Sequence, residues 1–233
     1  MKIGILEADR LAPEITATYG SYGQMSARLL SGVESDLTYI YWQARAGECP
    51  TDPAECDAWL LTGSKADAWA NEPWILQLMD FIQRVDQARA KLIGICFGHQ
   101  LIARALGGTV GKSDKGWGIG VMPTQIITPQ AWMQPPVSAF SLLYSHQDQV
   151  MTLPPRAVPI AGHDFCPHSS FQVGEHILTL QGHPEFSKAY ARLLINNRRD
   201  IIGAQRCTEA EQSMRLETDH EVIAQWLVGF YRT

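Results

Sequence analysis

The chain has 233 residues, a formal net charge of −5 and 45% apolar residues, which suits one large α/β domain or a domain with a helical appendage. Because the charged residues form no long runs of one sign, we expect no nucleic-acid partner. No apolar run approaches membrane-spanning length, and the chain opens directly on a strand pattern without a signal peptide. The five cysteines are odd in number and scattered, which disfavours a disulfide framework. These features predict a cytoplasmic protein that does not bind membranes.

The first half of the chain alternates strand patterns with helix patterns. Short apolar runs indicate buried strands, and apolar residues at helical spacing indicate the helices between them. The predicted strands are Lys2–Leu6, Leu37–Trp42, Ala58–Leu61 and Leu92–Ile95, and the predicted helices are Tyr22–Leu30, Glu72–Ala90 and Phe97–Leu106. This alternation predicts a three-layer α/β sandwich with a mostly parallel, flavodoxin-like central sheet covered by helices on both faces.

The pattern changes in the second half. Glycines break Thr109–Ile127 into short segments, which predicts an antiparallel excursion at the sheet edge. Further strands are expected at Leu142–Tyr144 and, as a meander that closes the sheet, at Val158–Ala161, Ser170–Val173 and His176–Leu180, with helices at Phe186–Ile202 and Glu209–Tyr231. Without a linker or internal repeat, we expect a single domain over residues 1–233, with a core over about 1–202 and a C-terminal helical extension over about 203–233.

The junction after the strand Leu92–Ile95 reads Gly94-x-Cys96-x-Gly98. Small residues two positions on either side are typical of a nucleophile elbow, a turn so tight that a Cβ there would collide with neighbouring backbone. The Cys96 thiol would then project near a helix N-terminus, whose dipole favours the reactive thiolate. A buried structural cysteine is the alternative interpretation.

A cysteine nucleophile needs a base and a group that orients the base. His183 lies just past a predicted strand, Pro184 holds the chain extended, and Glu185 follows two residues after His183. Because side chains alternate along extended backbone, His183 and Glu185 are expected on the same side. The carboxylate could then fix the imidazole tautomer while the other ring nitrogen faces the thiol. A surface histidine with an unrelated glutamate is the alternative, but the two motifs together predict a catalytic triad of Cys96, His183 and Glu185.

Gly-Ile-Cys96-Phe-Gly-His-Gln, followed downstream by Gly-His183-Pro-Glu185-Phe, resembles the class I (triad) glutamine amidotransferases, and more closely their GMP-synthase-like, stand-alone branch. The resemblance covers about Lys2 to Arg198. It implies that Cys96 attacks the side-chain amide of glutamine, forms a γ-glutamyl thioester and releases ammonia. Water activated by His183 would then release glutamate.

An oxyanion hole is expected beside the nucleophile. One donor should be the backbone N–H of Phe97, which follows Cys96 at the helix N-terminus. The second should come from a glycine loop that ends a neighbouring strand. Thr62-Gly63-Ser64 fits this description and is similar in position to the family's glycine loop, so we assign Gly63.

The resemblance also implies substrate-binding residues. Gln100 lies one helical turn after Cys96, and in the family this glutamine helps to hold the amino-acid end of the substrate. The stretch Ser145-His146-Gln147-Asp148 aligns with the family's second glutamine-binding loop, and Ser145, His146 and Gln147 are assigned to the substrate. Many glutamine amidotransferases carry glycine where this chain has Gln147, and this departure suits a γ-glutamyl peptide or conjugate better than free glutamine.

Three functions are therefore considered. The first is a glutaminase that supplies ammonia to a separate synthetase subunit, and the second is a stand-alone hydrolase of γ-glutamyl peptides or conjugates. The third, a catalytically silent partner-binding domain, is disfavoured because all three triad positions are filled. We expect no cofactor, because the chain has no phosphate-binding glycine motif. We also expect no metal site, because His163, Cys166 and His168 lack a fourth ligand at metal-binding spacing.

Overall fold

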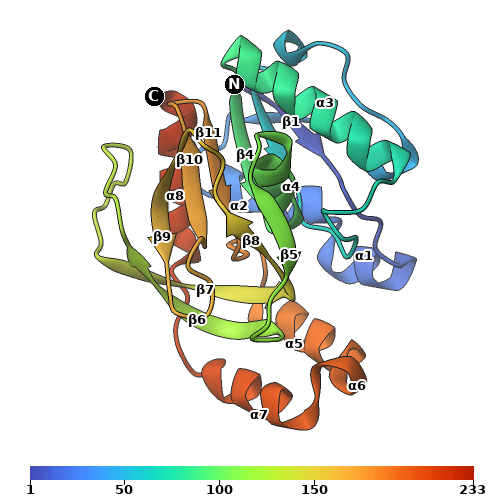
Figure 1. The fold of residues 1–233 in the computed structure, drawn as a ribbon, viewed down its shortest axis with the longest axis vertical. Helices are drawn as coiled ribbons and strands as arrows, with labels where there is room; N and C mark the ends of the chain where they lie inside the picture. The colour runs from blue at the N-terminus through green and yellow to red at the C-terminus, as the bar shows by residue number, and fades with distance from the viewer.

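A nine-stranded mixed sheet forms the centre of the computed structural model, which describes residues 1–233 (Figure 1). In spatial order its strands are β2 (Thr38–Trp42), β1 (Lys2–Leu6), β3 (Ala58–Leu61), β4 (Lys91–Ile95), β11 (Ile177–Leu180), β10 (Ser170–Val173), β9 (Ala157–Gly162), β6 (Gly118–Ile126) and β7 (Ala139–His146). From β2 to β11 neighbouring strands run parallel, and from β11 to β7 each pair is antiparallel. The four strands predicted in the first half of the chain are confirmed.

Helices cover both faces of this sheet. On one face, α2 (Tyr22–Ser31) and α8 (His220–Arg232) share a buried cluster with strand residues such as Ile5 and Ile93. On the other, α3 (Pro73–Ala88) and α4 (Phe97–Ala105) share a second cluster with Trp59 and Leu92. Two short 3-10 helices, η1 (Ala44–Ala46) and η2 (Pro53–Glu55), lie between β2 and β3. The predicted three-layer α/β fold is confirmed.

The antiparallel part of the sheet is more extensive than predicted. Strand β6 pairs with β7 along the whole of β7, so the strand expected at Leu142–Tyr144 spans Ala139–His146. A separate two-stranded sheet joins β5 (Thr109–Lys112) to β8 (Asp148–Thr152), a strand that was not predicted. The predicted meander of β9, β10 and β11 is confirmed, but it does not close the sheet, because it lies between β4 and β6.

The predicted C-terminal helices are wrong as continuous elements. The segment Phe186–Ile202 contains α5 (Lys188–Asn197) and α6 (Arg199–Ile202), and Glu209–Tyr231 contains the end of α7 (Ala204–Ser213) and most of α8. Between α7 and α8, the Asp219 N–H donates to the Ser141 carbonyl (2.9 Å), and the Asp219 carboxylate accepts the Ser141 N–H (2.7 Å). The chain has to leave the helix to make this contact with β7.

One helix was missed. Helix α1 (Pro13–Tyr19) is seven residues long and contains β-branched Ile15, Thr16 and Thr18, which give a weak helical pattern. None of the helices combines the length with the apolar character needed to cross a membrane.

Candidate active site

Cys96 lies at the turn between β4 and α4, with φ +53° and ψ −100°. Residues that carry a side chain rarely adopt this conformation, and the strain it stores is common at functional turns. A Cβ built on Gly98 would lie 2.4 Å from the carbonyl oxygen of Leu61, and one built on Gly94 would lie 2.7 Å from the carbonyl carbon of Gly98. Both flanking positions therefore need glycine, as an elbow requires.

His183 reaches the same edge of the sheet because β11 runs parallel beside β4. Its N–H donates to the Leu143 carbonyl (2.7 Å), which holds the residue just beyond the end of β11. A Cβ built on Gly63 would lie 3.1 Å from Cε1 of His183 and 3.7 Å from Cβ of Cys96. The imidazole, the cysteine and the glycine loop after β3 thus meet at one point.

Two neighbours orient the His183 imidazole. Its Nδ1–H donates to Oε1 of Glu185 (2.7 Å), which leaves Nε2 for the thiol. The Phe186 ring stacks on the imidazole, with ring centroids 3.8 Å apart and planes 7° apart. Burial lowers the pKa of His183, but the nearby Glu185 carboxylate and Cys96 sulfur raise it overall, to about 10. The ring is therefore an imidazolium at neutral pH and has a proton to donate.

The two expected oxyanion donors also lie beside the cysteine. Phe97 is the first residue of α4, so its N–H belongs to the first turn, whose amides have no acceptor in a preceding turn. The N–H of Gly63 donates no hydrogen bond to another group of the protein. Neither amide is therefore paired with an acceptor of the protein, as an oxyanion donor requires.

A cavity of about 370 Å³ opens at Cys96, and the four expected substrate-binding residues, Gln100, Ser145, His146 and Gln147, all line it. Two of these side chains also hold the cavity wall together. Nε2 of Gln100 donates to the Asp148 carbonyl (2.7 Å), and Nδ1 of His146 donates to the same oxygen (3.0 Å). Burial lowers the pKa of His146 to about 3, so this imidazole is neutral at physiological pH.

The sequence analysis missed the charged groups of the cavity, which are Lys65, Asp67, Lys112, Asp148 and Arg198. They come from four separate segments: the loop after β3, β5, the start of β8 and the junction of α5 with α6. Only Asp148 had a local signal, since it is the last residue of the stretch aligned with the substrate-binding loop, although it was not assigned to the substrate. The others are brought together by the strand order alone.

Two aromatic side chains accompany these charges. The Trp69 indole N–H donates to the Asp148 carboxylate (2.8 Å). The Arg198 guanidinium lies 5.6 Å from the centroid of the Trp117 ring, and it donates to the Ser145 hydroxyl (3.0 Å). The cavity therefore has an anionic group and a cationic group, each held in place by a neighbour.

The chain is similar to known proteins both in sequence and in fold. The family model "Glutamine amidotransferase class-I" matches residues 15–198. Gamma-glutamyl peptidase 3 of Arabidopsis thaliana is 31% identical over 183 residues, which cover 75% of this chain and 72% of that protein. A glutamine amidotransferase-like protein of Penicillium rubens is 29% identical over 76% of both chains.

The fold is shared over the full length of a solved structure. The crystal structure of a glutamine amidotransferase from Thermotoga maritima superposes with a TM-score of 0.76 at 18% identity, covering 99% of this chain and 96% of that one. Since the family model spans most of the residues and a relative above 30% identity is matched over more than two thirds of its length, the chain belongs to the class-I glutamine amidotransferase family.

Proposed function

We propose that this protein is a stand-alone cysteine hydrolase that cleaves the γ-glutamyl amide bond of peptides or conjugates. One observation carries the proposal: Cys96, His183 and Gly63 meet at the carboxyl edge of the parallel strands, where a cavity opens at Cys96. The similarity to gamma-glutamyl peptidase 3 supports the substrate class. In this proposal Cys96 is the nucleophile, His183 transfers protons, and Glu185 positions His183.

The first half of the reaction forms a thioester. The Cys96 thiol passes its proton to the His183 imidazole, and the resulting thiolate attacks the γ-carbonyl carbon. The carbonyl electron pair moves onto the oxygen, which accepts hydrogen bonds from the N–H groups of Phe97 and Gly63. When the tetrahedral intermediate collapses, the C–N bond breaks and the His183 imidazolium donates a proton to the leaving nitrogen. The products are a γ-glutamyl thioester and a free amine.

The second half consumes water. His183, now neutral, accepts a proton from a water molecule while the water oxygen attacks the thioester carbonyl. The C–S bond then breaks, the γ-glutamyl group leaves as glutamate, and the sulfur keeps the bonding electrons. This step restores the Cys96 thiolate and the His183 imidazolium, with Glu185 stabilising the imidazolium.

The cavity favours a leaving group larger than ammonia. Its volume of about 370 Å³ lies in the range of sites that bind whole small molecules. Its wall also carries Lys112 and the Arg198–Trp117 pair, which ammonia could not use. A glutaminase that supplies ammonia to a separate synthetase subunit is the second candidate, and the match to the amidotransferase family model favours it.

The test is a comparison of substrates with the purified protein alone. We expect γ-glutamyl dipeptides to be hydrolysed with a higher kcat/KM than glutamine, measured by mass spectrometry of the released amino acid and by ammonia release. Cys96→Ala should lower both rates by on the order of 10³-fold or more, because the nucleophile is lost.

Cys49→Ala serves as the matched control, since Cys49 lies outside the cavity and should leave both rates unchanged. A higher kcat/KM for glutamine would favour the second candidate. If wild-type protein hydrolyses neither substrate, the proposed function is wrong.

A further inference from the structure

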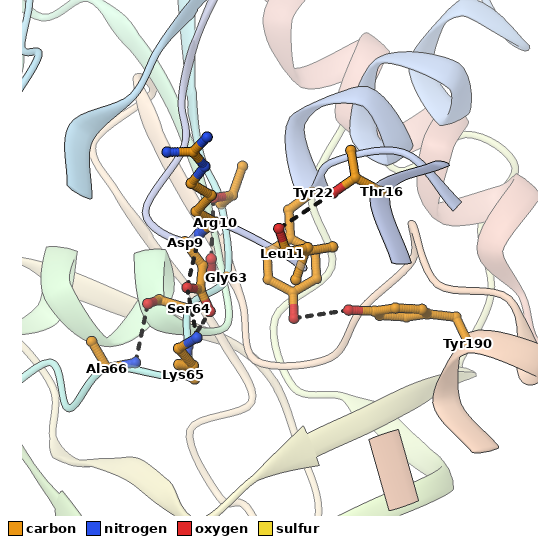
Figure 2. A network of polar contacts seen from close by, with 11 residues as sticks. Asp9, Arg10, Leu11, Thr16, Tyr22, Gly63, Ser64, Lys65, Ala66 and Tyr190 are labelled. Carbon is orange, nitrogen blue, oxygen red and sulfur yellow. Dashed lines mark hydrogen bonds and ion pairs between the residues drawn. The ribbon is translucent and has the colours of Figure 1, made fainter. Parts of the chain in front are cut away.

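Asp9 links the loop after β1 to the loop after β3 (Figure 2). The residue is buried, and each of its carboxylate oxygens accepts a backbone N–H: Oδ1 from Arg10 (2.8 Å) and Oδ2 from Lys65 (3.0 Å). The Lys65 ammonium lies 3.7 Å from Oδ1 but is largely exposed. A buried carboxylate is costly unless its oxygens are paired, and the Lys65 N–H, which pairs one of them, holds Asp9 and Lys65 in one relative position.

The hydrogen bond to the Lys65 N–H lies two residues after Gly63. Thr62, the residue before Gly63, makes a second contact with the loop after β1. Thr62 Oγ1 accepts the Ala8 N–H (3.0 Å) and donates to the Gly63 carbonyl (3.1 Å). The Gly63 carbonyl and the Lys65 N–H are therefore both linked to the loop after β1, the first through Thr62 and the second through Asp9. Within this short segment, the Gly63 N–H remains without a partner in the protein.

The far end of the same loop is tied to the nucleophile's own helix. The Arg104 guanidinium, in α4, donates to the carbonyl oxygens of Ala68 (2.9 Å) and Ala70 (2.6 Å). Trp69, between them, donates to the Asp148 carboxylate at the start of β8. Residues 62–70 are thus held at both ends by contacts within the chain.

We propose that Asp9 is a positioning residue for the oxyanion hole: through the Lys65 N–H it keeps the Gly63 N–H aimed at the site of the Cys96–His183 pair. The inference rests on the proposed function, since it assigns Asp9 a part in the same reaction. It also means that the hole is assembled in the isolated chain, so that hydrolysis needs no activating partner.

The test separates oxyanion stabilisation from thiol reactivity. Asp9→Ala should lower kcat for a γ-glutamyl dipeptide by about 10- to 100-fold with little change in KM, less than the 10²–10³-fold typical when an oxyanion donor is removed outright. Alkylation of Cys96 by iodoacetamide, followed by mass spectrometry of its peptide, should proceed at the wild-type rate, because that displacement creates no oxyanion. Asp9→Asn, which keeps one acceptor oxygen, should recover part of the activity.

Asp57→Ala is the matched control. Its carboxylate also accepts a backbone N–H of the β1 region, from Lys2 (2.7 Å), but at the opposite end of β1 and β3. This variant should hydrolyse the dipeptide at the wild-type rate. Amide hydrogen exchange should become faster over residues 62–66 in Asp9→Ala and remain unchanged there in Asp57→Ala.

Several outcomes would overturn the inference. A kcat for Asp9→Ala equal to that of the wild type would overturn it. A fall in the rate of Cys96 alkylation as large as the fall in kcat would also overturn it, because the effect would then lie on the thiol. If wild-type protein hydrolyses no γ-glutamyl substrate, the proposed function fails instead. In that case amide hydrogen exchange still tests the role of Asp9. An unchanged exchange rate over residues 62–66 in Asp9→Ala would show that Asp9 does not fix the loop after β3.

Discussion

At the scale of single residues, the His183–Glu185 pair sets the charge of the proposed site. Burial favours a neutral imidazole, yet the adjacent carboxylate and sulfur raise the pKa of His183 to about 10. Because this lies above the unfolded value of about 6.5, protonation of His183 stabilises the folded protein. That contribution is fully present below pH about 6.5 and is lost as the pH rises through about 10.

Glu185→Gln tests this assignment. The amide can still accept the Nδ1–H of His183, but it has no charge, so burial should move the pKa of His183 down by more than about one unit. NMR titration of the imidazole would measure the shift. Hydrolysis should fall by less than in His183→Asn, for which we expect a loss of about 10²–10⁴-fold because the proton-transfer group is removed. A His183 pKa that stays near 10 in Glu185→Gln would contradict the role given to the carboxylate.

At the scale of elements, the turn from β4 into α4 depends on the close approach of α4 to β3. The backbone of Gly98 lies so near the Leu61 carbonyl that a side chain cannot be accommodated without moving one of the two elements. Since Cys96 precedes Gly98 by two residues, any such movement displaces the thiol from His183. The same packing that shapes the core therefore sets the position of the proposed nucleophile.

Gly98→Ala should accordingly lower both stability and hydrolysis. We expect a loss of about 1–3 kcal/mol in the free energy of unfolding, typical of overpacking, measured by urea denaturation, with a marked fall in kcat. Gly111→Ala is the control, since its nearest neighbour would be Cγ of Met151 at an ordinary 3.8 Å. Equal stability of the two variants would show that the approach of α4 to β3 is not tight.

At the scale of the whole molecule, the last helix belongs to the main core. Helix α8 packs with α2 on one face of the sheet, and its residues Ile223, Trp226 and Phe230 share a buried cluster with Ile5 of β1. The two ends of the chain are therefore coupled through one apolar layer. Loss of α8 would expose the face of the sheet opposite α4.

Phe230→Ala measures this coupling. The side chain is fully buried, so its removal should cost about 3–5 kcal/mol of unfolding free energy, through lost burial and the cavity left behind. Leu216→Ala, at a side chain that is 46% exposed, should change stability by no more than about 0.5 kcal/mol. Urea denaturation of both variants checks the difference, and similar values would indicate that α8 contributes little to the core.

Some features could be predicted from the sequence because they depend on a few consecutive residues. The glycines around Cys96 reflect backbone sterics within one turn, and the pairing of His183 with Glu185 follows from a two-residue separation. The parallel strands of the first half were readable as short apolar runs. The breaks between helices near Arg198 and Asp219 could not be predicted. Helical spacing of apolar residues continues across them, and contacts with distant strands interrupt the helices.

The sequence by itself thus determined the family, the fold class and the residues proposed for the chemistry. Only the tertiary structure decided which strands are neighbours, and hence that Lys112 and Arg198 line the cavity and that Asp9 bonds to Lys65, 56 positions away. The physical reason is one of range. Backbone conformation and burial are encoded over a few residues, whereas a contact between distant segments exists only once the sheet order has brought them together.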